Sequence, residues 1–314
     1  MFTKYLLRRL IYVIPTLLIT TFVVFSLILL IPGDPVVALL GENATPEKIA
    51  QLQEQMGLNK PIIIQYGDWL LNAVQGDLGR SLFTGEPVFD AVIGRLGVTL
   101  QLVVISTIIS VSFGMLFAVI SVYFPNNLLD YLARFVSIVG ASFPNFWIAM
   151  LLVILFSLHL GWFPSTGFTN ITDNPGGFLK TVMLPAISLG AIGIAVITRH
   201  LRSSLLEVME SDYVRTAYSK GNSRWKAIFS HGLRNAMLPV VTTIGIGFGN
   251  AIGGTVVIET IFAIPGVGQL AVNAILQRDF MILQGVILIL IMLVIIINFI
   301  TDIIYAILDP RIEY

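Results

Sequence analysis

The side chains that could carry out covalent or metal chemistry do not form a recognisable catalytic or metal-binding pattern in this sequence. None of the 314 residues is a cysteine, which excludes disulfides, thiolate zinc sites and thiol catalysis. Three histidines, His159, His200 and His231, are scattered over different regions, and we expect each to have a structural or interfacial role. The sequence has no Gly-Lys pair, which a Walker A loop requires, and no GxSxG or HExxH pattern. We therefore expect no catalytic residue, no metal site and no cofactor, and hence no enzyme.

A polar segment, residues 199–239, interrupts an otherwise apolar chain and contains seven of the eighteen Lys and Arg residues. Ser211 or Asp212 can cap a short helix over residues 213–220. Gly221 can take the left-handed conformation that ends this helix, and a second helix can follow. The pattern predicts a helix, a glycine turn and a helix. The alternative is an ordinary basic cytoplasmic loop.

Composition indicates a membrane protein. Hydrophobic residues make up 56% of the chain and charged residues only 11%, whereas about a quarter of the residues in a soluble domain are charged. The basic residues lie beside apolar segments and form no aromatic-basic surface, so we expect no nucleic-acid partner. The expected fold class is therefore an all-α, polytopic membrane protein.

Apolar stretches that can cross about 30 Å of hydrocarbon predict about six transmembrane helices. With six spans the N terminus, the turn at 124–134, the segment 199–239 and the C terminus lie on one side and hold twelve Lys and Arg. The outer loops near 159–181 and 263–284 hold one each. Both termini are therefore expected to be cytoplasmic. The spans are expected at residues 9–31, 98–123, 133–158, 184–198, 240–258 and 285–308.

Residues 32–97 form a long hydrophilic stretch between the first two spans, with eight acidic and four basic residues. Pro46 and Gly57 bound one predicted helix, because proline favours the first helical position and glycine the position after the last. A second helix is predicted from Pro61 to Val74. We expect an ordered external helical insertion that packs on the bundle; a spacer with incidental helices is the alternative.

The predicted spans also contain residues that shape a helix or its packing. Gly245, Gly249 and Gly253 form small-xxx-small registers, which allow close helix approach in lipid. They suit either a moving helix at a pathway or partner interface or static packing within one bundle. Pro144 is expected to bend the third span. Glu259, at the outer membrane edge, is expected to face protein or water, with either a gate role or a structural one.

The segment 199–239 resembles the signature cytoplasmic loop of ABC importer permeases, in which Glu-Ala-Ala, a glycine and a later Ile/Leu-Pro form the surface that docks on the ATPase. The corresponding residues here are Arg215-Thr216-Ala217, Gly221 and Leu238-Pro239, so two of the three triplet residues depart from the general form. Phrases spread over nearly the whole chain are similar to the oligopeptide, dipeptide and nickel branch of these permeases. They include IPGDP, GDLGRSLFTGEPV, RSSLLEVMESDYVRTAYSKG, HGLRNAMLPVVT and DPRIEY.

The resemblance implies a permease subunit of an ATP-driven importer in a bacterial or archaeal cytoplasmic membrane. Its implied partners are a second, similar permease in a heterodimer, two cytoplasmic ATPase subunits that hydrolyse the ATP, an external solute-binding protein and membrane lipid. Peptides are favoured as the substrate because no span has a His, Asp or Cys cluster for a bare metal. Nickel or another small solute is the alternative, followed by a transporter driven by an ion gradient. The residues expected to dock on the ATPase are Asp212, Tyr213, Arg215, Thr216, Ala217, Lys220 and Gly221.

Overall fold

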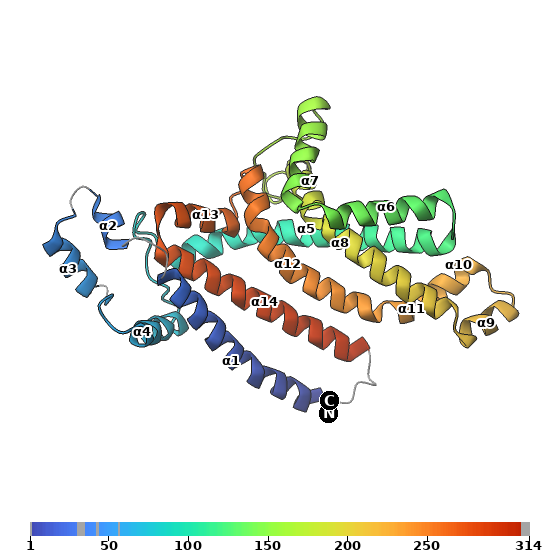
Figure 1. Cartoon of the computed structure of the whole chain (residues 1–314), viewed down its shortest axis with the longest axis horizontal. Helices are drawn as coiled ribbons and strands as arrows, with labels where there is room; N and C mark the ends of the chain where they lie inside the picture. The colour runs from blue at the N-terminus through green and yellow to red at the C-terminus, as the bar shows by residue number, and fades with distance from the viewer. Residues whose placement is uncertain (1, 30–34, 42–43, 56, 309–314) are drawn as a thin grey trace. The chain divides into compact units, whose positions relative to one another are not determined.

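The computed structural model describes residues 2–29, 35–41, 44–55 and 57–308, and every regular element in this part is a helix (Figure 1). The expected all-α class is confirmed. The phrase DPRIEY lies wholly, and IPGDP all but its last residue, outside the described residues. The chain forms two compact units. The first comprises Met1–Thr99 and Pro265–Ile295, and the second comprises Leu100–Ile264 and Ile296–Tyr314.

Helices long and apolar enough to cross a membrane are found where the sequence predicts spans. A further candidate consists of α6 (Leu128–Ser142) and the continuous helical segment formed by α7 (Asn145–Leu152) and η2 (Val153–His159). Together these two parts are long and apolar enough to cross a membrane, but they are bent by 112° relative to each other. In α1 (Phe2–Leu29) the apolar segment with described side chains is Ile11–Ser26. Six spans therefore stay a prediction, with a candidate segment for each. The four unbroken candidates are α5 (Val88–Tyr123), α8 (Pro175–Met209), α12 (Leu238–Phe262) and α14 (Phe280–Leu308).

The bend between α6 and α7 has a local cause at Pro144. Phe143 ends α6 in an extended conformation, with φ −107° and ψ 139°, as the residue before a proline prefers. Pro144 then precedes the first helical residue of α7, where its missing N–H leaves no partner unsatisfied. The expected bend is therefore present, and it divides the segment into two separate helices.

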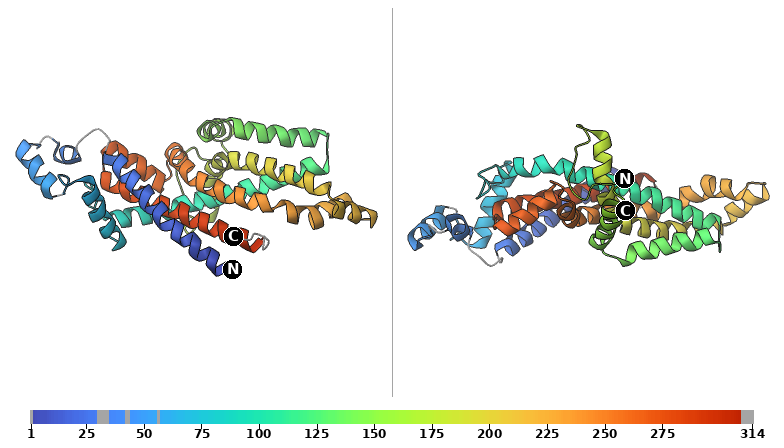
Figure 2. Two further views of the ribbon diagram at one scale, coloured as in Figure 1. Left: turned by 60° about the horizontal axis from the view of Figure 1, so that its bottom comes forward. Right: turned by 90° about the horizontal axis from the view of Figure 1, so that it is seen from above.

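In the second unit α8 packs against α5, α6, α7 and α12 (Figures 1 and 2). This helix is 35 residues long, well beyond the expected span 184–198, and Pro185 lies inside it. Gly190 and Gly193 lie within this apolar helix and permit close approach to α5. A Cβ atom at Gly190 would lie 2.8 Å from the Ser106 carbonyl oxygen. The Ser110 hydroxyl donates to the Gly190 carbonyl at 2.9 Å, so α5 and α8 are also joined by a hydrogen bond.

In the glycine register of α12, Gly245 makes a close contact and Gly253 does not. A Cβ atom at Gly245 would lie 2.3 Å from Thr301 Cγ2 of α14, so these helices touch there. A Cβ atom at Gly253 would have no neighbour within 4 Å among the described atoms, and Gly253 is exposed. Gly249 is half-buried. The neighbouring Gly254 instead faces α8, where a Cβ atom added to it would lie 2.9 Å from Leu189.

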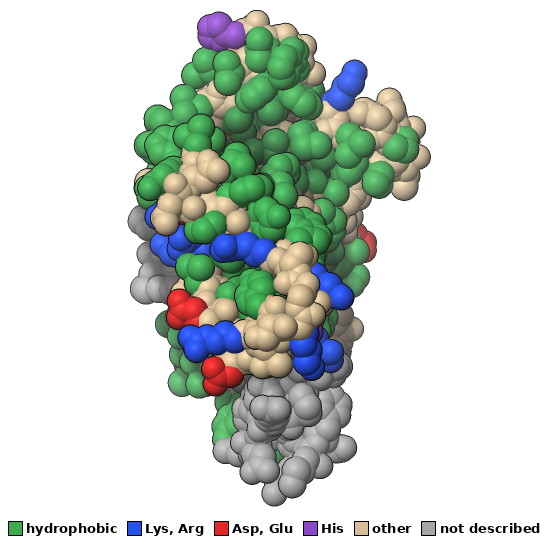
Figure 3. Space-filling view, turned by 90° about the vertical axis from the view of Figure 1, so that its right-hand side faces the viewer, with side chains coloured by type: hydrophobic (Ala, Val, Ile, Leu, Met, Phe, Trp, Pro, Cys, Tyr) green, Lys and Arg blue, Asp and Glu red, His purple; other side chains and the backbone are tan. Residues whose placement is uncertain are grey.

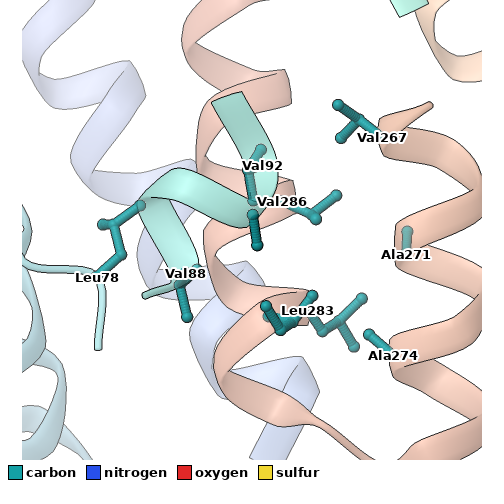
Figure 4. Packing of buried hydrophobic residues seen from close by; sticks show 10 residues of the cluster. Leu78, Val88, Val92, Val267, Ala271, Ala274, Leu283 and Val286 are labelled. Atoms are coloured by element: carbon teal, nitrogen blue, oxygen red, sulfur yellow. The ribbon is translucent and has the colours of Figure 1, made fainter. Parts of the chain in front are cut away.

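In the first unit, α5, α13 (Val267–Gln277) and α14 build an apolar core, in which Val88, Leu283 and Val286 are buried (Figure 4). Gly285 has no side chain because Val88 Cγ1 occupies the space, only 2.2 Å from a Cβ position there. The Ser81 hydroxyl donates to the buried carboxylate of Asp279 at 2.6 Å, which ties the segment before α5 to the start of α14.

The insertion after the first span contains α2 (Pro35–Leu40), α3 (Pro46–Gln55) and α4 (Ile62–Val74). The helices expected from Pro46 and over residues 61–74 are therefore present, and Gly57 has φ +69° as expected for its end position. α4 packs on α1 through Tyr66, whose hydroxyl donates to the Leu18 carbonyl at 3.0 Å. Phe22 and Phe25 of α1 contact the Tyr66 ring edge-on. The α4 part of the insertion is thus packed on the first span.

Candidate coupling surface

The segment 199–239 folds as a series of short helices that begins inside α8. Its first eleven residues complete α8, which ends at Met209. They are followed by α9 (Asp212–Ser219), α10 (Arg224–Lys226), η3 (Ala227–Gly232) and α11 (Leu233–Ala236). Ser211 occupies the cap position of α9, but its hydroxyl donates back to the Val208 carbonyl at 2.6 Å and does not accept from α9.

The helix α9 has one buried and one exposed face. Val214 and Ala217, three residues apart, are buried against the protein. Of the expected docking residues Ala217 therefore anchors the helix, and its side chain is not at the surface. Arg215 Nη1 lies 3.7 Å from Asp212 Oδ1, but both side chains are largely exposed, so this ion pair holds neither in place. The residues expected to dock that are exposed are Asp212, Tyr213, Arg215, Thr216, Lys220 and Gly221.

Gly221 ends α9 in the left-handed conformation that the sequence predicts, with φ +79°. Its N–H donates to the Tyr218 carbonyl at 2.9 Å, and the Asn222 N–H donates to the Ala217 carbonyl at 3.2 Å. The chain then reverses into α10, where the Ser223 hydroxyl accepts from the Lys226 N–H at 3.4 Å. The predicted helix, glycine turn and helix are confirmed as local structure.

Specific contacts connect these short helices to the ends of α5 and α8. Arg224 Nη2 donates to the Val122 carbonyl of α5 at 2.8 Å. The Trp225 ring meets the Tyr123 ring edge-on, with 5.7 Å between centroids. Ile228 is buried in a cluster with residues of α5 and α8. These contacts tie α10 and η3 to two of the long helices.

A buried carboxylate that the sequence interpretation missed joins α5, α6 and α8 beside this surface. Asp130 is 1% exposed and accepts from the Ser121 hydroxyl, the Arg134 guanidinium and the Asn126 N–H. Arg202 Nε of α8 donates to the same Ser121 hydroxyl at 2.6 Å. The four-residue spacing of Asp130 and Arg134 was the available signal, because residues so spaced share a helix face.

The outward face of this segment is basic. Figure 3 looks toward the α9 and α10 end of the second unit and shows Lys and Arg side chains among hydrophobic and a few acidic ones. Tyr213 and Trp225 are also about half exposed, and the Tyr213 hydroxyl accepts from Asn235 Nδ2 at 2.8 Å. The exposed basic residues of the segment are Arg199, Arg215, Lys220, Arg224, Lys226 and Arg234.

A separate cavity of about 420 Å³ lies within the second unit, among α5, α7, α8 and α12. Its polar lining includes Ser110, Asn145, Thr243 and Asn250, and its only titratable lining side chain among the described residues is His200. His200 Nδ1 lies 2.8 Å from the Thr243 hydroxyl. Asn145 Oδ1 is buried and has no hydrogen-bond partner among the described atoms. The cavity thus offers uncharged hydrogen-bonding groups in an apolar wall.

The remaining residues singled out in the sequence lie away from any metal-binding arrangement. His159 Nδ1 is hydrogen-bonded to the Ile154 carbonyl oxygen at 2.7 Å. Glu259 is fully buried near the end of α12 and therefore faces protein, one of the two surroundings expected for it. Within the part of the chain that the structure describes, no three His, Cys, Asp or Glu residues are grouped as a metal site would require.

Comparisons with known proteins agree with this architecture. The family described as "Binding-protein-dependent transport system inner membrane component" matches residues 110–314, and the corresponding N-terminal family matches residues 1–103. A putative peptide transport system permease protein of Brucella melitensis is 42% identical over 314 residues, covering 100% of both chains. The oligopeptide transport system permease protein AppB of Bacillus subtilis is 40% identical, covering 99% of both.

A similar fold occurs in a solved structure of the MetNI methionine ABC transporter in an inward-facing conformation. The TM-score is 0.58 at 16% identity, over 69% of this chain and 96% of that chain, and this likeness concerns the fold alone. The matched family covers well over half of the sequence, and the relatives align from end to end. The chain therefore belongs to the family of binding-protein-dependent transport system inner membrane components, the permeases of ABC importers.

Proposed function

We propose that this chain is the membrane-spanning permease of an ABC importer of di- or oligopeptides. The coupling part of the proposal rests on the structure of α9. This short helix lies near the ends of two long helices and has a buried apolar face and an exposed polar face. The peptide substrate is supported by relatives in Brucella and Bacillus that are named as peptide and oligopeptide transport permeases and match the whole chain.

In the proposed mechanism α9 sits in a groove of a cytoplasmic ATPase and acts as a lever. The exposed residues Asp212, Arg215 and Lys220 suit a polar partner surface, while buried Ala217 holds the helix to the permease. ATP-driven closure of the ATPase dimer moves α9. The Arg224 contact with Val122 then passes the displacement to α5. The long helices change their packing, and the bundle switches from inward-facing to outward-facing.

The proposed assembly has a second, similar permease, two ATPase subunits and an external solute-binding protein. The family description, a component of a binding-protein-dependent transport system, supports the last of these. The lack of a Gly-Lys pair in this chain supports a separate ATPase, since the chain has no Walker A loop of its own. The cavity among α5, α7, α8 and α12 has no acidic, Lys or Arg side chain among its described lining residues. This also favours energy from ATP over an ion gradient, which commonly uses charged groups in the membrane.

The cavity among α5, α7, α8 and α12 is the proposed contribution of this chain to the translocation pathway. Asn145, Asn250 and Thr243 offer donors and acceptors that match peptide amide groups. The surrounding Leu and Ile side chains tolerate different substrate side chains, because apolar contact is not directional. Weak, neutral contacts also suit a site that a substrate must leave again.

Purification of the chain from its native membrane in mild detergent tests the function. The proposal expects a second permease and an ATPase to accompany the chain, with ATP hydrolysis stimulated by a binding protein loaded with peptide. Stimulation by a nickel-loaded binding protein and not by peptide would contradict the substrate class. A chain that purifies alone and transports in vesicles under an ion gradient would contradict the importer itself.

A further inference from the structure

A second cavity of the same unit has a different character from the proposed pathway. It lies between α6 and α8, has a volume of about 540 Å³, and is strongly basic. The polar residues that line it are Arg134, Arg199, Arg202, Ser137, Ser142, Thr198 and Ser203. No acidic residue is among its lining residues in the described part of the chain. A cavity with this lining is suited to an anion.

The positive charge in this cavity is only partly compensated by the protein. The carboxylate of Asp130, outside the lining, accepts from Arg134 and has Arg202 Nε at 3.7 Å. Arg134 Nε is nevertheless buried without a hydrogen-bond partner among the described atoms. Arg199 forms no hydrogen bond or ion pair with any described residue. The one carboxylate therefore contacts only two of the three guanidinium groups, those of Arg134 and Arg202. Donors of Arg134 and Arg199 remain for a ligand.

A phosphate group matches these donors. Arginine binds phosphate oxygens through its planar fork of N–H groups, and such charge-assisted hydrogen bonds are among the strongest in proteins. The Ser203 hydroxyl, which has no partner among the described residues, adds a neutral donor on the same wall as Arg199. Arg134, whose side chain is 39% exposed, lines the cavity from the opposite helix.

The surroundings of the cavity favour a phosphate that belongs to a lipid. The outward side chains of α6 are apolar and between 48% and 68% exposed, as on a surface covered by acyl chains. The turn that precedes α6 is predicted to be cytoplasmic, where basic pockets between membrane helices meet anionic head groups. Those outward side chains are Leu128, Tyr131, Leu132, Phe135 and Ile138.

We propose that the cavity between α6 and α8 binds the phosphate head group of an anionic phospholipid from the cytoplasmic leaflet. The acyl chains of this lipid lie along the apolar face of α6, and its phosphate is held by Arg199, Arg134 and Ser203. The site joins the helix that continues toward α9 to the neighbouring α6. Binding there does not depend on which solute is transported, so the proposed function and this site can fail independently.

Lipid retention by the intact complex tests the site. The complex is purified in mild detergent, exposed to phosphatidylglycerol or phosphatidylcholine, and analysed by native mass spectrometry. Arg199→Gln is expected to lower phosphatidylglycerol retention about ten-fold, the effect of losing one charge-assisted hydrogen bond. Arg234→Gln, the same charge change at an exposed position outside the cavity, is the matched control and should retain the lipid as the wild type does.

Two further variants separate the site from a general effect of charge or folding. Arg199→Lys keeps the charge but loses the planar fork, so retention should be intermediate. Ser203→Leu fills the cavity without changing the charge and should also reduce phosphatidylglycerol retention. Arg199 and Ser203 are exposed and lie outside the Asp130 hydrogen bonds, so both variants should fold.

Several outcomes would overturn the proposal. Equal phosphatidylglycerol retention by the wild type, Arg199→Gln and Ser203→Leu would exclude the site. Inorganic phosphate that displaces phosphatidylglycerol at low concentration, where chloride does not, would assign the cavity to a free anion. If the Arg199→Gln complex loses the second permease but retains the lipid, Arg199 binds a carboxylate of the second permease and not a lipid phosphate.

Discussion

At the scale of single residues, Gly221 connects backbone conformation to the proposed lever. Its φ of +79° strains any other residue by about 1–3 kcal/mol, yet an added Cβ would meet no described atom within 4 Å. Gly221→Val should therefore insert and assemble normally, but the turn after α9 should shift. Peptide uptake is expected to fall about ten-fold while ATP hydrolysis continues. A ten-fold change corresponds to about 1.4 kcal/mol in the free-energy difference between the coupled and uncoupled positions of α9. Uptake and hydrolysis are both measured in proteoliposomes.

Gly76 provides the matched control because it carries the same strain far along the chain from α9. Its φ is +86°, and an added Cβ there also has open space. Gly76→Val should leave uptake close to the wild-type rate. Uptake at the wild-type rate by Gly221→Val, at equal expression, would contradict the lever assignment.

Asp130 and Asp212 are carboxylates of the same unit, and we expect only Asp130 to contribute measurably to stability. Asp130 is buried and accepts from Arg134, Ser121 and the Asn126 N–H, so Asp130→Asn should cost about 2 kcal/mol. Asp212 is fully exposed, so Asp212→Asn should not change the unfolding temperature measurably. Thermal unfolding in detergent, followed by tryptophan fluorescence, compares them. Equal shifts for the two variants would contradict the buried role.

At the scale of elements, the glycines of α12 predict different effects from the same substitution. A Cβ at Gly245 would lie 2.3 Å from Thr301 Cγ2, so Gly245→Ala must displace α14 or the Thr301 side chain. Overpacking of this kind costs about 1–3 kcal/mol. Gly253→Ala meets no described neighbour and gains up to about 1 kcal/mol of helix propensity. The unfolding temperature should therefore fall for Gly245→Ala and rise for Gly253→Ala. A shift in the same direction for both variants would contradict a contact of α12 with α14 at Gly245.

Several elements could be predicted from the sequence because their signals are local. The cap and glycine positions predicted α9 and its turn, and Pro144 predicted the bend between α6 and α7. The length of α8 could not be predicted in this way. Its Pro185 and Gly190 break a hydropathy pattern, but tertiary contacts with α5 stabilise the helix through them.

The candidate coupling surface was also only partly predictable. Exposed residues such as Arg215 and Lys220 follow from the loop pattern, but the burial of Ala217 depends on which side of α9 meets the protein. The shared contacts of Asp130 with Ser121, and of Ser121 with Arg202, join three helices. Such contacts arise between residues far apart in sequence, so no local pattern reports them.

At the scale of the whole molecule, the sequence predicts six spans by summing hydropathy and charge. The structure supplies a candidate segment for each, but the pair α6 and α7 with η2 is bent by 112°. A segment bent in this way either crosses the membrane or returns to the side from which it entered. Only the first case puts the 199–239 segment and the turn at 124–127 on the same, cytoplasmic side, as ATPase coupling requires.

The lack of native cysteines makes this question directly testable, because each introduced cysteine is unique. Asn127 and Thr172 are exposed positions on either side of the bent pair, and Ser219 is exposed on α9. An impermeant thiol reagent should label Thr172→Cys in intact spheroplasts, but should label Asn127→Cys and Ser219→Cys only after permeabilisation. Labelling of Asn127→Cys and Thr172→Cys from the same side would make the bent pair a re-entrant element. In that case the bent pair would not count as a span. The chain would then have an odd number of spans, and α8 would still be the one crossing between Thr172 and Ser219.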